Sequence, residues 1–150
     1  MDPERVATLV RAFSKTRRSE IVAAWEIAES MGGDLVALLA EAFPQVRTSA
    51  GRASILRYVG GFSRESEIAF RMGIGAVQDR SRAVRHYGCA ILAYSLRTDA
   101  IPTLSSLLKH PDRTTAEDAK AALDALKNRN HNFFRDRDNS GRVFWGYGSE

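Results

Sequence analysis

Three basic side chains at helical spacing are the strongest candidates for binding chemistry in this sequence. Arg82, Arg85 and His86 stand at i, i+3 and i+4, so a helix through them places all three on one face. Arginine offers a planar fork of N–H donors that matches carboxylates and phosphates. Arg47 joins this set if the two valine-arginine pairs of the sequence are aligned. The pattern predicts a face that binds an anionic partner; the alternative is a solvated face on which Arg85 bridges to an acid of the next repeat.

The charge of the chain is concentrated around these residues. The formal net charge is +4, but the segment from Gln45 to Arg97 holds nine arginines against three acids, which leaves −2 for the rest of the chain. Such a field attracts acidic proteins or nucleic acid without distinguishing them. Arg52 lies within this segment in an otherwise apolar stripe, so we expect it to be paired in the interior or to extend its guanidinium to solvent.

Conventional catalytic patterns are not recognisable in the sequence. His86, His110 and His131 fall on different predicted elements without H-E-x-x-H spacing, and Cys89 has no predictable base beside it. The chain lacks a serine in a nucleophile elbow and a glycine-rich phosphate loop after a strand. We therefore expect a protein that is not an enzyme, with no catalytic residues, cofactor, metal or small-molecule substrate.

Length and composition indicate one ordinary soluble domain. The chain has 150 residues, of which 44% are hydrophobic and 27% are charged. The longest apolar run, Leu35 to Ala40, is far shorter than a membrane-spanning helix, and the first residues do not resemble a signal peptide. The lone Cys89 is expected to fill a core position. These features predict a cytoplasmic protein that does not bind membranes.

Helical periodicity and cap residues predict an all-α body. Asp2-Pro3 opens a first helix, Ser19 is expected to cap a second that ends at Gly32-Gly33, and a third runs from Asp34 to Pro44. Further helices are predicted at about 48–59, 65–77, 80–96, 101–109 and 116–128, the last opened by a capping box at Thr115 and Asp118. Because the intervening loops are short, neighbouring helices are expected to be antiparallel.

The predicted helices repeat along the chain. Leu35-Val36, Ile68-Ala69 and Ile101-Pro102 are in register at intervals of thirty-three residues. A fixed period of this size is typical of a helical solenoid, an α-α superhelix of stacked pairs. The alternative is a non-repetitive helical bundle whose apolar stripes coincide by chance.

Residues 81–126 carry a family resemblance. They contain Val84-Arg85, the small residues of Gly88–Leu92, the pattern A-x-P-x-L-x-x-L-L at Ala100–Leu108, the turn His110-Pro111-Asp112, and the stripe within Ala119–Leu126. This segment resembles the HEAT-repeat family. The resemblance implies a curved stack of about four antiparallel helix pairs over residues 1–130, related to armadillo folds, which that family uses chiefly as a binding surface.

The last twenty residues, 131–150, differ from the helical body. Asn132-Phe133-Phe134 and Val143-Phe144-Trp145 bracket Asp138–Gly141, which predicts a short C-terminal β-hairpin around a glycine turn. We expect its aromatic face to dock on the last helices and to cap the same domain. The alternative is an exposed patch that recruits a partner.

The same turn resembles the opening of a calcium-binding EF-hand loop. Asp136, Asp138, Ser140 and Gly141 have the spacing of that loop, but Tyr147 stands where a bidentate glutamate is required. A turn in which Asp and Asn side chains bond to their own backbone explains the same residues, and we expect no calcium site.

These observations predict a HEAT-like scaffold or adaptor. Its basic concave helix face, formed by Arg47, Arg82, Arg85 and His86, is expected to receive an acidic protein surface. One alternative is a nucleic-acid-binding HEAT-like protein, which the basic segment favours and the scarcity of lysines and interleaved aromatic residues disfavours. A second alternative, by analogy of fold, is a bacterial immunity protein that masks a toxin.

Overall fold

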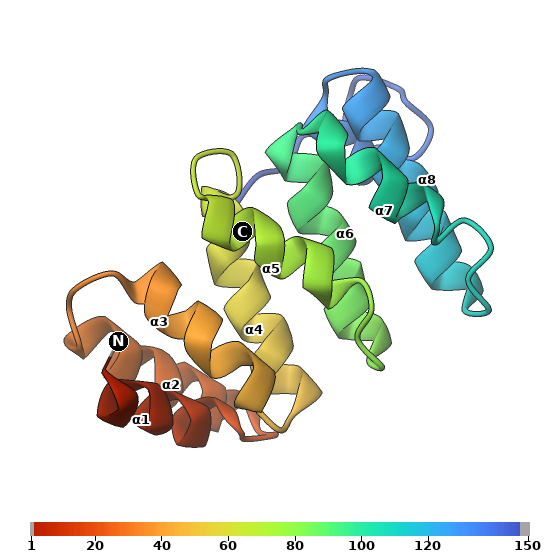
Figure 1. Ribbon diagram of the computed structural model, residues 1–150. Helices are drawn as coiled ribbons and strands as arrows, with labels where there is room; N and C mark the ends of the chain where they lie inside the picture. Colours follow the sequence, from red (N-terminus) through yellow and green to blue (C-terminus); the bar gives the residue numbers. More distant parts are fainter. Residues whose placement is uncertain (1, 148–150) are drawn as a thin grey trace. The chain divides into compact units, whose positions relative to one another are not determined.

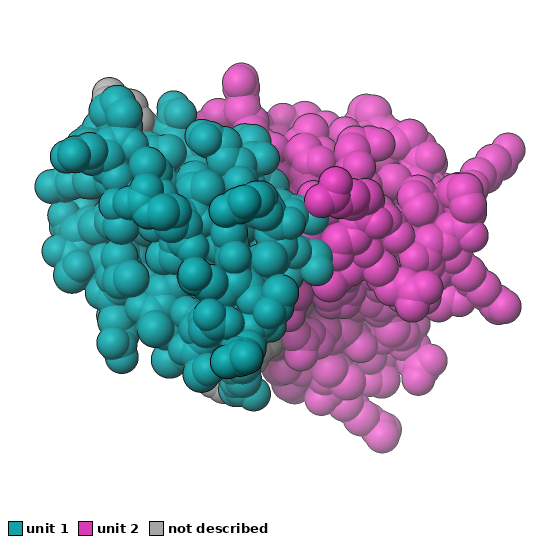
Figure 2. All heavy atoms as spheres, turned by 90° about the horizontal axis from the view of Figure 1, so that it is seen from below, with its two compact units in different colours: residues 1–55 teal, residues 56–150 magenta. Residues whose placement is uncertain are grey.

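The computed structural model describes residues 2–147, which form two compact units. Unit 1 comprises residues 1–55 and unit 2 residues 56–150, coloured teal and magenta in Figure 2. The prediction of an all-α body is confirmed, because 68% of the chain is helical and no strand occurs among the described residues. No helix in residues 2–147 combines the length and the apolar character that crossing a membrane requires.

Unit 1 is built from α1 (Pro3–Phe13), α2 (Arg18–Ser30), α3 (Leu35–Ala42), the 3₁₀ turn η1 (Phe43–Gln45) and the first part of α4 (Ser49–Val59) (Figure 1). The predicted start of α1 is confirmed, since the Asp2 carboxylate accepts hydrogen bonds from the backbone N–H groups of Glu4 and Arg5. The start of α2 differs from the prediction, because Arg17 and not Ser19 is the N-cap residue. Helix α1 packs against both α2 and α3.

Unit 2 contains two helix pairs. They are α5 (Glu67–Ala76) with α6 (Arg82–Ser95), and α7 (Ile101–Ser105) with α8 (Arg113–Lys127); α6 also packs against α8. The short 3₁₀ helices η2 (Gly60–Phe62), η3 (Thr98–Ala100) and η4 (His131–Phe134) connect or follow them. The core between the pairs is formed by small and aliphatic side chains, among them Cys89, Leu92, Leu104, Ala122 and Leu126. The two pairs therefore share one hydrophobic core.

The first helices of the pairs begin at the predicted period. Leu35, Ile68 and Ile101 each lie in the first turn of α3, α5 and α7. Ile68 and Ile101 are nevertheless 42% and 38% exposed, so the repeated positions set the helix starts and contribute little to the core. The superhelical stacking itself stays a prediction.

The start of α8 differs from its predicted capping box. Asp112 is the N-cap residue and accepts a hydrogen bond from the backbone N–H of Thr114. Thr115 and Asp118 lie inside the helix, where both side chains are buried. Helix α8 therefore begins three residues earlier than predicted, and Thr115 and Asp118 are free to bind side chains of α6.

The predicted β-hairpin at residues 131–150 is wrong. Residues 131–134 form η4, residues 135–147 contain no strand, and residues 148–150 lie outside the described part of the chain. The backbone groups that a strand ladder would use are bound by nearby side chains. Asn130 accepts the N–H of Asn132, and Asp136 accepts the N–H groups of Ser140 and Gly141. The turn around Asp136 thus bonds to its own backbone, as expected from its Asp-rich sequence.

Candidate functional site

Three of the four predicted binding residues, Arg82, Arg85 and His86, lie on α6 in unit 2, and their side chains contact acids of α8 or of its N-cap. Arg82 and Arg85 both donate to Asp112, and His86 contacts Asp118. Arg47 lies in unit 1, in the turn before α4. The structure thus brings two of the four residues together on one carboxylate.

Arg85 occupies the interior of unit 2. The residue is 7% exposed. Its Nη2 lies 2.8 Å from Asp112 Oδ2, its Nε donates to the Thr115 hydroxyl at 2.9 Å, and its Nη1 donates to the backbone carbonyl of Asp79 at 3.0 Å. The bridge to an acid of the next repeat, raised as the alternative from the sequence, describes this position, so Arg85 stabilises the fold and presents little surface to a partner.

Arg82 binds the same oxygen of Asp112 but remains exposed. Its Nε donates to Asp112 Oδ2 at 2.8 Å, and 65% of its side chain is accessible. The hydrogen bond from Arg82 and those from the backbone N–H groups of Thr114 and Thr115 lower the pKa of Asp112 to about 2, although partial burial opposes this shift. Asp112 is therefore ionised at neutral pH, and its single charge meets two guanidinium groups.

His86 is part of a second, separate network on the same helix. Its Nδ1 lies 2.9 Å from Asp118 Oδ2, and Arg137 Nη2 donates to Asp118 Oδ1 at 3.0 Å. Burial acts to raise the pKa of Asp118, but the hydrogen bonds from His86 and Arg137 outweigh it and the pKa lies below its usual value. The His86 side chain is 36% exposed. Asp118 therefore fixes the imidazole ring against α8.

Arg47 and Arg52 have different surroundings: Arg52 is bonded in the interior, which is one of the two expectations from the sequence, whereas Arg47 is exposed. The side chain of Arg47 is exposed, and its backbone N–H donates to Ser14 Oγ at 3.1 Å. Arg52 is 7% exposed, and its Nη1 donates to the backbone carbonyl of Val46 at 3.1 Å. Arg52 stands thirty-three residues before Arg85 and makes the same bond to a carbonyl six residues earlier, so it is the counterpart of Arg85.

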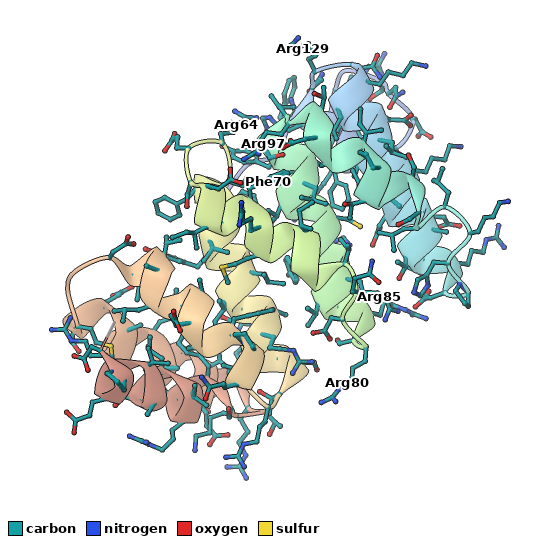
Figure 3. The ribbon with its side chains drawn as sticks, viewed as in Figure 1. Arg64, Phe70, Arg80, Arg85, Arg97 and Arg129 are labelled. Carbon is teal, nitrogen blue, oxygen red and sulfur yellow. The ribbon has the colours of Figure 1, made fainter. Side chains whose placement is uncertain are left out.

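The end of unit 2 around Asp112 carries an excess of basic side chains. The Arg82–Asp112 contact joins the first residue of α6 to the N-cap residue of α8. We call this region the Asp112 surface; its exposed basic residues are Arg80, Arg82, Lys109 and Arg113. Figure 3 shows Arg80 extending away from the chain at the turn after α5. Sequence reasoning missed Arg80, although it stands two residues from Arg82.

Other parts of the described chain show weaker evidence for a binding or catalytic site. A hollow of about 240 Å³ on α8 is lined by Glu117, Lys120, Ala121, Asp124, Phe133 and Arg137. Its two acidic and two basic side chains leave no net charge to attract an ion. Within residues 2–147, no group of three or more His, Cys, Asp or Glu side chains has the arrangement of a metal site. Burial raises the pKa of Cys89 to about 12, so this thiol is a weak nucleophile in the folded protein.

No protein-family model, curated protein or solved structure matches the chain.

Proposed function

We propose that this chain is a cytoplasmic protein-interaction module that binds an acidic protein through the Asp112 surface. The observation that carries the proposal is the sharing of one carboxylate by two arginines, one buried and one exposed. Arg85 satisfies its charge inside the fold, while Arg82 keeps most of its side chain in solvent. Arg113 pairs with Glu117 at 3.1 Å, so the donors offered to an approaching carboxylate come chiefly from Arg82, which shares the single charge of Asp112 with Arg85, and from the exposed Arg80.

The distribution of charge between the units supports this location. Residues 56–150 hold fifteen of the twenty-two basic side chains and eleven of the eighteen acidic ones, so the whole net charge of +4 belongs to unit 2. Unit 1 has equal numbers of basic and acidic side chains. Long-range attraction of an acidic partner would therefore act on unit 2.

The repeated helix pairs support a binding role over an enzymatic one. The HEAT-like sequence pattern at 81–126 falls on α6, α7 and α8, whose shared core is made mainly of small and aliphatic side chains. A rigid pair of this kind presents its turns and outer faces to partners. The single Cys89 is buried as a free thiol, which suits a reducing compartment.

The proposal is tested by neutralising the exposed arginines and leaving the buried one intact. Arg80→Ala combined with Arg82→Ala removes two charges from the Asp112 surface. Arg129→Ala combined with Arg142→Ala removes the same charge elsewhere in unit 2. The partner is first identified by mass spectrometry of what co-purifies with the native protein, and its dissociation constant is then measured for each variant.

We expect the first pair of substitutions to weaken binding by about tenfold or more and the control pair to have little effect. Equal affinities of the two variants would contradict the proposed surface. Titration with mixed-sequence DNA and RNA at about 50 and 200 mM salt gives the second arm of the test. Tight binding to nucleic acid with a steep loss in salt would replace the proposal by the nucleic-acid alternative.

A further inference from the structure

The far end of the C-terminal segment, residues 135–147, is fastened to η4 through Trp145. The backbone N–H of Trp145 donates to Asn132 Oδ1 at 2.9 Å, and its indole Nε1 donates to the His131 carbonyl at 2.7 Å. In return, His131 Nε2 lies 2.7 Å from the Trp145 carbonyl oxygen. The segment has no strand or helix of its own, so these side-chain bonds hold its far end in place.

The opposite edge of the His131 ring meets an arginine. Arg64 Nη2 lies 2.6 Å from His131 Nδ1, and Arg64 is itself fixed because its Nε donates to the Tyr94 carbonyl at 2.7 Å. The Arg64 guanidinium also lies over the Tyr94 ring, 4.1 Å from its centroid. Since arginine can only donate, Nδ1 must accept, and the ring proton must be on Nε2, where it donates to Trp145. The contacts therefore require a neutral His131.

The surroundings of the ring favour that neutral form. Helix α6 contributes Tyr94, the C-terminal segment contributes Trp145, and the residues after η2 contribute Arg64 as the charged group. No carboxylate in the described part of the chain contacts the imidazole. Burial, together with the Arg64 charge, holds the pKa of His131 below its usual value, although the bond to the Trp145 carbonyl opposes this shift.

We propose that His131 is an acid-operated latch for the C-terminal segment. A proton on Nδ1 removes the acceptor for Arg64 and sets two cations side by side, so the ring and the bonded Trp145 move away from α6. The surface this uncovers includes Tyr94, whose ring centroid lies 5.0 Å from that of Tyr147. It also includes Gly60, where Tyr147 packs so closely that a Cβ atom would lie within 2.4 Å of its ring. Mild acid thereby exposes an aromatic surface on unit 2.

The sign of the effect follows from linkage. With the pKa of His131 lowered in the closed form, the open form binds protons more readily below the ordinary value of 6.5. The closed form is fully favoured above that pH and loses its advantage as the pH falls through the lowered pKa.

The latch is tested by the fluorescence of Trp145 in a Trp25→Phe background, followed from about pH 8 to about pH 4.5. We expect a change in emission centred below pH 6.5. His131→Gln keeps one acceptor and one donor but does not titrate, so its emission should stay constant. His110→Gln, a substitution of the same kind in a turn, should retain the transition.

A second variant, Arg64→Met, keeps the proposal testable if His131→Gln does not fold. Arg64→Met removes the opposing charge, so protonation of His131 should no longer drive the segment open and the change in emission should be strongly reduced. A transition in His131→Gln equal to that of the parent protein would overturn the latch. So would an undiminished transition in Arg64→Met, or constant emission of the parent protein down to about pH 4.5.

Discussion

Arg52 in unit 1 and Arg85 in unit 2 are two buried arginines in equivalent positions. They lie thirty-three residues apart, and each is 7% exposed. Each donates its Nη1 to a backbone carbonyl six residues earlier, that of Val46 in one case and of Asp79 in the other. The shared geometry shows that each arginine bonds the start of its helix, α4 or α6, to the turn before that helix.

The two positions differ in the packing of the residue just before the arginine. Gly51 lies against the backbone of Phe13, whereas Val84 carries a buried side chain. In unit 2, Asp112 binds both Arg85 and the exposed Arg82. The repeat thus preserves the buried arginine and varies the packing around it.

The largest expected effect on stability comes from placing a side chain at Gly51 of α4, whose counterpart in α6 is Val84. In Gly51→Ala, the added Cβ would lie 1.8 Å from the Phe13 carbonyl oxygen, so backbone must move. We expect the free energy of unfolding to fall by about 4 kcal/mol or more. Denaturant unfolding followed by Trp25 fluorescence measures the loss, because the Trp25 ring packs against Phe13.

Gly75→Ala is the matched control for this substitution. Gly75 lies in α5, and a Cβ there meets no atom within 4 Å. Alanine should increase stability there by about 0.5–1 kcal/mol through its helix propensity. Similar losses in both variants would show that α4 does not depend on close approach at Gly51.

A smaller effect separates the buried arginines from the exposed one. Arg85→Met leaves the buried Thr115 hydroxyl without its donor and should cost about 3 kcal/mol. Arg82→Met breaks an ion pair of the same length at the surface and should cost less than about 1 kcal/mol. Arg52→Met should resemble Arg85→Met in chemical denaturation. If it resembles Arg82→Met, the equivalence of the two buried arginines fails.

The smallest expected effect is on the stability of the protein at acidic pH. Because the pKa of Asp112 is lowered to about 2 from 3.8, its carboxylate contributes stability that is complete above pH 3.8 and is lost as the pH falls through about 2. Asp112→Asn retains the helix cap but not the charge, so its stability should decline less over that interval. Thermal unfolding at a series of pH values measures the difference, and coincident curves would contradict it.

The sequence was sufficient to predict that the helices exist, although not every boundary, because several of their starts are marked by local chemistry. Asp2, Asp34 and Ser81 accept N–H groups of the first turns, and these bonds depend on residues two or three positions away. The tail was predicted as a hairpin because its aromatic residues suit strands. Its actual form depends on contacts such as Trp145 with His131, which are fourteen residues apart.

The surroundings of the candidate site could not be predicted for a related reason. Arg85 meets Asp112 and Thr115 across 27 and 30 residues, beyond any spacing within one helix. Aligning Arg47 with Arg85 through their preceding valines also missed the true counterpart, Arg52, which alone preserves the thirty-three-residue period. The thirty-three-residue period relates Arg52 to Arg85, but Arg52 lies in an apolar stripe and was therefore not grouped with the other basic residues.

The buried thiol of Cys89 is a natural probe for transient opening of the core of unit 2. In the closed core of unit 2 the sulfur is inaccessible and strongly favours its protonated form. An alkylating reagent can therefore react only during moments when α6 separates from its neighbours. The rate of alkylation of Cys89 therefore reports how often the core opens. It can be measured without an engineered label, in each variant as well as in the natural sequence.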